Sequence, residues 1–442
     1  ACGQTTVKFC APSWTSEEES APRSCSNPTN IMRVAVVFLA ILAAANAHPI
    51  RRQASVMSYD DMHGYTPVSD VTEIAKIDED QQRILNAVGE SPVNFAEAKR
   101  LYTTGPLQAL STGLGDMAEA NAIQMKTDGR SVIQTYASYW DANKINGDPS
   151  VTCKAGTVLN GCPNYADVMV MAALNGAGDY AYTTPGDRDA ARAQIAKKGT
   201  AYHAAWMYSI AQLSAAISKA DGFTNSTKKM ADGSTAESVV GHHIDRAWAY
   251  YTGSQNAVMP LSLAKARGVN FGTCSAVPDA ILAEFNAMQA AAMTDTFDKK
   301  EIDTRGRNLV PLMTIPMIQG CIRYASIADG LVMDLETANV TRLEALAETW
   351  IFCAGVIPQL LPADQRTVRN MVDPAKKATI VKGDIIAALE NNYNRMGVTP
   401  AQVGVFNPDG ACAEASSASG VSASLMLSLA AALLAVVGVR GA

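Results

Sequence analysis

The sequence predicts an all-α fold with little or no sheet, and three observations support that class. Apolar residues recur at three- and four-residue spacing along most of the chain, as at Trp206, Ile210, Leu213 and Ile217, which is the period of a helix with one buried face. The chain is also rich in Ala, Leu and Met, which favour helices. Strict alternation of apolar and polar residues, the pattern of a half-buried strand, is hard to find over five or more positions.

The helical pattern divides into two packed halves. It predicts a first helical half over residues 76–220 and a second over 236–405, joined by a linker at 221–235 where DGFTNST and ADGS interrupt the periodicity. The segments AEAKRLYTTG (96–105) and DRAWAYYTGS (245–254) each end an Ala- and aromatic-rich helix with Thr-Gly. This similarity suggests a pseudo-repeat, with one helical bundle in each half.

One helix of the second half contains two prolines. Pro311 and Pro316 lie in an apolar run, and a proline inside a helix removes a backbone hydrogen bond, so we expect a kink or a break at Pro316. Such a bend serves packing alone in one interpretation. In the other it opens a pocket near Arg323 and Tyr324.

The two ends of the chain carry targeting patterns. Residues 32–47 run from a charged start through an apolar stretch to Ala-Asn-Ala, which predicts a secretory signal peptide. Residues 425–442 form an apolar tail behind a spacer at 406–424, which predicts a lipid-anchor (GPI) signal, with a membrane-spanning tail as the alternative. Residues 1–31 are expected to be a leader or non-native extension, and the polar residues 48–75 a linker or loosely docked arm. The signals place the folded domain on the extracellular face of the plasma membrane or in the periplasmic space.

Six of the nine cysteines lie beyond residue 47, and an even number in a secreted chain favours disulfides. Cys153 and Cys162 bound a short glycine-containing loop, so a local disulfide is expected there. The other four are Cys274, Cys321, Cys353 and Cys412. They allow three pairings, and buried free thiols are the alternative for Cys321 and Cys353. Glycosylation sequons begin at Asn225 and Asn339.

Charge and motifs exclude several classes of function. The chain has 36 Lys and Arg against 42 Asp and Glu, a net charge of −6, which argues against a nucleic-acid partner and against binding to an anionic membrane surface. The sequence contains no G-x-S-x-G, no H-E-x-x-H and no glycine-rich phosphate loop. We therefore expect a protein that is not an enzyme, and a helical enzyme with an unfamiliar site is the remaining catalytic alternative.

The strongest candidate for a metal site is the helix predicted over 237–251. His243 and Tyr250 share one face of it, and Asp245 flanks the neighbouring apolar stripe. Ferric iron prefers carboxylate and phenolate oxygen with imidazole in support, so the three side chains are expected to border a cation-binding groove. In the alternative interpretation this is a core helix, where Tyr250 makes a structural hydrogen bond and Asp245 pairs with a neighbouring arginine.

Other oxygen donors are Glu301, Asp303 and Glu390, with Asp167 in YADVMV as a further carboxylate. Glu301 and Asp303 converge only if KKEIDTR forms a loop, and a solvated stretch is the alternative. Glu390 shares a helix face with Tyr393, although both residues are also suited to docking the last helix.

Five segments of the second half form an ordered set. They are GHHIDRAWAYYTGS (241–254), SLAKARGVNFGTC (262–274), VPLMTIPMIQGCIRYASIAD (310–329), LEALAETWIFCAGVIPQL (343–360) and ENNYNRMGVTPAQVG (390–404). In this order and spacing the chain resembles the low-iron-inducible periplasmic, or iron-assimilation, proteins of algae. The first half fits more loosely, through NFAEAKRLYTTG and YADVMVMAALNGAGDY (165–180), so the resemblance covers roughly residues 90–405.

The resemblance implies a secreted, non-enzymatic protein that aids iron capture at the cell surface. Its ligand would be ferric iron (Fe3+) or a small iron complex, and its expected partner a surface iron transporter or reductase. A structural or adhesion protein of the cell envelope without metal is the alternative.

Overall fold

The computed structural model describes residues 62–104, 165–177, 189–224, 229, 233–255, 258–293, 295–335, 340–410 and 412. All of these described residues belong to a single unit of the chain. Its α-helices are α2 (Thr72–Ala75), α3 (Ile77–Val88), α4 (Phe95–Thr103), α7 (Tyr165–Asn175), α8 (Asp189–Lys198), α9 (Ala205–Ala220), α10 (His242–Thr252), α11 (Pro260–Asn270), α12 (Ala276–Ala292), α13 (Lys299–Ile327), α14 (Val340–Ala354), α15 (Pro362–Val372), α16 (Lys382–Glu390), α17 (Tyr393–Met396) and α18 (Pro400–Val403). Short π-helices, η3 (Gly199–Ala204) and η4 (Glu237–Gly241), lead into α9 and α10.

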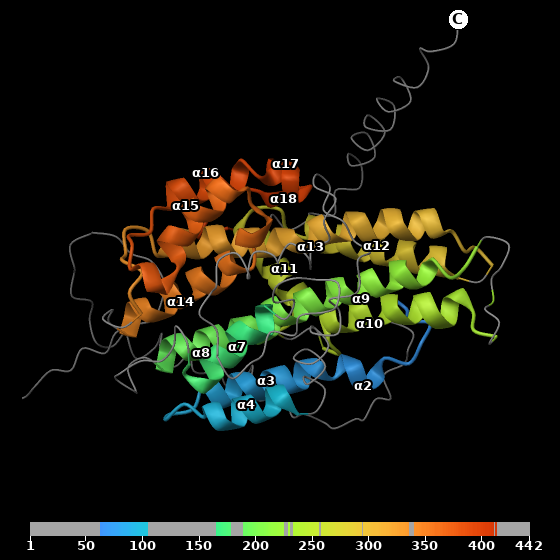
Figure 1. The fold of residues 1–442 in the computed structure, drawn as a ribbon, viewed down its shortest axis with the longest axis horizontal. Helices are drawn as coiled ribbons and strands as arrows, with labels where there is room; N and C mark the ends of the chain where they lie inside the picture. The colour runs from blue at the N-terminus through green and yellow to red at the C-terminus, as the bar shows by residue number, and fades with distance from the viewer. Residues whose placement is uncertain are drawn as a thin grey trace, which may run out of the picture. The chain divides into compact units, whose positions relative to one another are not determined.

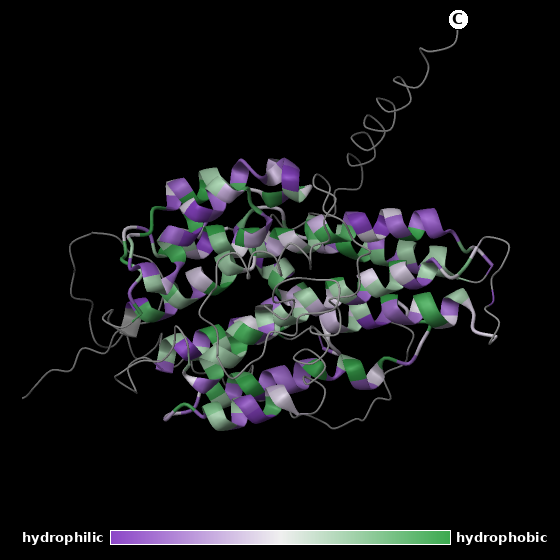
Figure 2. Ribbon diagram, viewed as in Figure 1, coloured by the Kyte–Doolittle hydropathy of each residue, from purple (hydrophilic) through white to green (hydrophobic). Residues whose placement is uncertain are grey.

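The predicted all-α class is confirmed. Within the described ranges the only β-pairing consists of isolated bridges, at Met62 with Tyr65, Lys229 with Thr235, and Val332 with Thr379. The helices carry both hydrophobic and hydrophilic residues along their length (Figure 2), as expected where each helix buries one face. Among the described helices, none is long and apolar enough to cross a lipid bilayer.

The helices of the two predicted halves share one core. Helix α9 packs along α10 and against α13, while α8 packs on α14 (Figure 1). The long helix α13 also lies against α12 and α14. Trp206 of α9, Trp248 of α10 and Trp350 of α14 are all fully buried in this core. The first-half helices α8 and α9 therefore complete their packing on second-half helices.

Helix α13 does not end at either proline. It runs from Lys299 to Ile327 with Pro311 and Pro316 inside it, so of the kink or break expected at Pro316 the break does not occur. Packing against α9, α12 and α14 holds the helix on several sides, which offsets the backbone hydrogen bonds that the prolines remove. The Thr314 hydroxyl also donates to the Val310 carbonyl within this stretch, at 2.8 Å.

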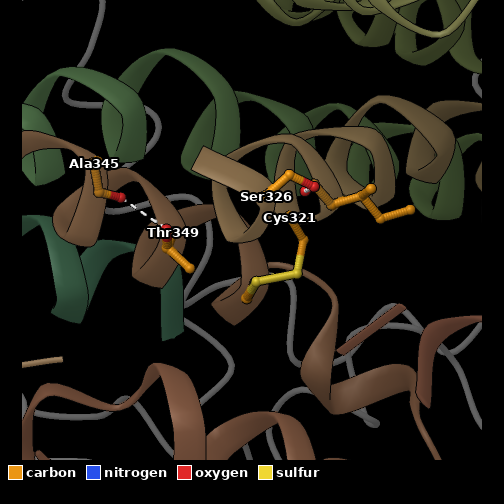
Figure 3. Close-up of a disulfide and its surroundings, with 6 residues drawn as sticks. Cys321, Ser326, Ala345 and Thr349 are labelled. Carbon is orange, nitrogen blue, oxygen red and sulfur yellow. Dashed lines mark hydrogen bonds between the residues drawn. A yellow bond between two sulfur atoms is a disulfide. The ribbon is translucent and has the colours of Figure 1, made fainter. Parts of the chain in front are cut away.

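Two disulfides fix the pairing that the sequence left open. Cys274 bonds to Cys412, and Cys321 of α13 bonds to Cys353 of α14 (Figure 3). Free thiols at Cys321 and Cys353 are thus excluded. The predicted Cys153–Cys162 bridge, the sequons at Asn225 and Asn339, and the segments 1–31, 32–47 and 425–442 lie outside the described residues.

The described part of the predicted 48–75 arm is packed into the core. Met62, Tyr65 and Val71 are all buried. The centres of the Tyr65 and Trp248 rings lie 5.4 Å apart, and the indole nitrogen of Trp248 donates to the Met62 carbonyl at 2.9 Å. The buried side chains are widely spaced between polar residues, which is why the segment has the composition of a linker.

Candidate functional site

Asp245 lies on α10 and is completely buried, at 0 % exposure. Five hydrogen bonds reach its carboxylate. The Tyr65 hydroxyl (2.6 Å) and Gln289 Nε2 (2.9 Å) donate to Oδ1. The backbone amides of Val68 (3.0 Å) and Ser69 (2.7 Å) and the Ser69 hydroxyl (2.7 Å) donate to Oδ2. An ionised carboxyl group offers about four lone-pair sites, so these donors already saturate it.

The same contacts explain what Asp245 does. They tie the segment around Tyr65 and Ser69 to α10, and Gln289 adds α12 to the junction. Burial and the neighbouring Asp245 carboxylate raise the pKa of Tyr65 well above its usual value, so its hydroxyl keeps its proton and remains a donor. Asp245 is therefore held by neutral donors and not by the arginine that the sequence suggested. It anchors the 62–71 segment to α10.

His243 and Tyr250 point toward different partners from Asp245. His243 Nδ1 lies 2.9 Å from Gln212 Oε1 of α9, and burial together with the charge of Arg246 lowers the pKa of His243 to about 4. Tyr250 packs edge-on against Tyr208 of α9, with ring centroids 4.5 Å apart, and burial raises its pKa to about 12. The structure therefore does not gather the predicted carboxylate, imidazole and phenol around one ion.

Two of the three remaining predicted ligands are paired with arginines, and the third is exposed. Glu301 and Asp303 lie in the first turns of α13, where they accept hydrogen bonds from Arg305 (2.7 Å) and Arg307 (2.8 Å), each four residues further on. Glu390 is exposed at the end of α16. Across the described ranges, no group of three or more His, Cys, Asp and Glu side chains is placed to hold a metal ion.

Besides carboxylates, tyrosine can supply an oxygen ligand to a hard cation. One buried tyrosine lies beside a second buried carboxylate. Tyr102, near the end of α4, is fully buried, and Asp167, in the first turn of α7, is 4 % exposed. Burial, together with the adjacent Asp167 carboxylate, raises the pKa of Tyr102 well above its usual value. Phenolate and carboxylate oxygens suit a hard cation such as Fe3+.

Sequence reasoning singled out Asp167 but not its partner. Tyr102 follows the apolar spacing of α4, so its pattern indicates a core residue. Its position beside Asp167 depends on the packing of α4 on α7, between segments that are far apart in the sequence. The signal that could have found it is the tyrosine in the helix end at 96–105, which the pseudo-repeat comparison already aligned with DRAWAYYTGS.

A comparison with known families matches nearly the whole chain. A family model described as low iron-inducible periplasmic protein covers residues 33–423. This match includes the segments that hold Tyr102, Asp167 and Asp245, and it extends beyond the resemblance seen in the sequence at both ends. No curated protein and no solved structure gives a significant match.

Proposed function

Because the chain belongs to the family of low iron-inducible periplasmic proteins, we propose that it binds iron during iron assimilation and that it does so without catalysing a reaction. The family match over residues 33–423 carries this proposal. Its description places members in the periplasm and links their production to iron shortage. A protein made under those conditions and in that place is suited to capturing iron before uptake.

The Tyr102–Asp167 pair is the proposed part of the ferric site. Burial holds the Tyr102 hydroxyl in its protonated form, so the phenolate forms when a cation displaces the proton. A bound Fe3+ would then receive one phenolate and one carboxylate oxygen from α4 and α7. Asp245 is not proposed as a ligand, because five donors already occupy its oxygens.

Equilibrium dialysis of the purified chain against ferric nitrilotriacetate tests the proposal. The wild type is expected to retain iron, and Tyr102→Phe and Asp167→Asn are expected to bind at least about tenfold more weakly. Tyr250→Phe is the matched control, since it removes a buried phenol that faces Tyr208, and it should bind like the wild type. Thermal unfolding followed by circular dichroism verifies that each variant is folded.

One result would count against the proposed site, and another against the proposed function. If Tyr102→Phe binds iron as tightly as the wild type, the pair is structural. If the wild type itself retains no iron, the alternative of a metal-free structural or adhesion protein of the envelope is favoured. One observation already fits that alternative: Asp245, His243 and Tyr250 all serve packing or hydrogen bonding between elements.

The attachment and partners of the protein form a finer proposal. We propose that the tail at 425–442 directs a lipid anchor, that Asn225 and Asn339 carry glycans, and that iron passes to a surface transporter or reductase. Release of the protein from cells by a phosphatidylinositol-specific phospholipase is the expected result. Retention until detergent is added would instead identify a spanning tail.

A further inference from the structure

Two arginines, one on α11 and one on α13, lie against the ring of Tyr324, and neither is paired with an acid among the described residues. Arg267 of α11 is buried, at 7 % exposure, and Arg323 of α13 is half-buried. Burial lowers the pKa of Arg267, the Tyr324 phenol opposes that change, and the positive charge of Arg323 adds to it. The two guanidinium groups thus share Tyr324 as a neighbour.

The contacts of Arg267 are all neutral. Its Nη1 donates to Asn270 Oδ1 at 2.8 Å, and its Nη2 donates weakly to the Tyr324 hydroxyl at 3.4 Å. The guanidinium carbon lies 5.4 Å from the centre of the Tyr324 ring and 5.7 Å from that of Phe352. Its Nε is buried and has no acceptor within the described part of the chain.

Arg323 shows the same pattern. Its guanidinium carbon lies 5.8 Å from the centre of the Tyr324 ring and 5.6 Å from that of Phe406, and its buried Nε also has no acceptor in the described ranges. Elsewhere on α13 the arginines are paired, as Arg305 is with Glu284 and Arg307 with Asp303. The unpaired guanidinium group of Arg323 thus differs from those of the other two arginines on α13.

The surroundings supply positive charge and phenols but little negative charge. The Phe352 ring stacks on the rings of Tyr324 and Tyr202, with ring centres 5.1 Å and 6.0 Å apart. Lys198 lies over the Tyr202 ring, and the nearby carboxylate of Glu348 is already paired with Lys198 at 3.1 Å. The charges of Arg267 and Arg323 therefore remain without a counterion in the described structure.

We propose that Arg267 and Arg323 together bind a small oxyanion, the carboxylate or phosphate group of a soluble ligand. Buried charges are stable when they are paired and hydrogen-bonded, and an oxyanion would accept from the Nε–H groups of both arginines. The planar guanidinium group suits such anions, because its N–H donors match their oxygens. The Nε atom of each arginine has no acceptor in the described ranges, so these two N–H groups are the donors left for the anion. This site is independent of the proposed ferric ligands.

Isothermal titration of the whole chain, made metal-free on a chelating resin, tests the inference. Inorganic phosphate and citrate are titrated separately against a chloride reference of equal ionic strength. The wild type is expected to bind at least one of them saturably, and the anion that binds more tightly identifies the source of the oxyanion. Arg323→Gln should weaken binding at least about tenfold, whereas Arg307→Gln, an exposed arginine of the same helix, should leave it unchanged.

Arg267→Lys is the second variant, because it keeps the buried charge and loses the planar donor fork. It is expected to weaken binding while circular dichroism remains that of the wild type. The bound anion should also raise the midpoint of thermal unfolding of the wild type, since it binds only the folded state. The inference is overturned if neither anion binds more tightly than chloride, or if Arg323→Gln binds as well as the wild type.

Discussion

At the scale of single residues, the partners of a side chain decide its role more than its chemical type does. Asp245, His243 and Tyr250 were expected to border one groove because they lie on one helix. The structure instead joins Asp245 to Tyr65, 180 positions earlier in the chain, and His243 to Gln212 on α9. Helical spacing predicted their faces correctly, but partners supplied by a distant segment could not be predicted from local periodicity.

The anchoring role of Asp245 can be tested by Asp245→Asn. The amide keeps the volume of the side chain, but it removes the charge and places a donor against the donors that surround the carboxylate. We expect the free energy of unfolding to fall by about 2–4 kcal/mol, measured by urea denaturation. Asp303→Asn is the control on an exposed pair with Arg307, and it should change stability by less than about 1 kcal/mol. Equal effects for the two variants would exclude the anchor.

The buried position of His243 predicts a dependence of stability on pH. Its pKa is about 4 in the folded chain against an ordinary value of 6.5, so the unfolded state binds more protons between these values. The stabilising contribution is complete above pH 6.5 and is lost as the pH falls toward 4.

His243→Gln removes this titration and keeps a donor toward Gln212. The loss of unfolding free energy between about pH 7 and pH 5 should therefore be smaller in the variant than in the wild type, as measured by urea denaturation at both values. Equal losses would show that His243 is accessible to protons in the folded state.

At the scale of elements, the close contact of α13 and α14 depends on a residue without a side chain. A Cβ atom on Gly320 would clash with Cδ1 of Phe352, and the adjacent Cys321 carries the disulfide to α14. The sequence predicted both helices, yet nothing in it favoured pairing Cys321 with Cys353. That pairing follows from the packing of α13, which continues through its two prolines. Local rules would have interrupted the helix there.

Gly320→Ala tests this contact. The added methyl group must displace Phe352 from between Tyr202 and Tyr324, so we expect a loss of about 1–3 kcal/mol in the free energy of unfolding. Gly383→Ala, on α16, adds its methyl group in open space, so it should instead be neutral or stabilising by up to about 1 kcal/mol. Denaturant melts of both variants make the comparison, and a neutral Gly320→Ala would contradict the close packing.

At the scale of the whole molecule, the all-α class followed from periodicity, while the assembly of the halves did not. Helices α8 and α9 bury their faces on α14, α10 and α13, and the polar-looking residues around Tyr65 complete the core. The candidate ferric pair arises in the same way, because Tyr102 and Asp167 meet only through the packing of α4 on α7. A single sequence carries no direct signal for contacts between helices that lie so far apart.

The proposed binding of ferric iron through the phenolate of Tyr102 is tested most directly by a visible-light titration. Addition of ferric nitrilotriacetate to the wild type should produce a phenolate-to-iron charge-transfer band. The band should be stronger at higher pH, because burial raises the pKa of Tyr102 and its proton must leave. It should vanish in Tyr102→Phe and persist in Tyr250→Phe. A wild type that develops no band, or a band that survives in Tyr102→Phe, would contradict the account.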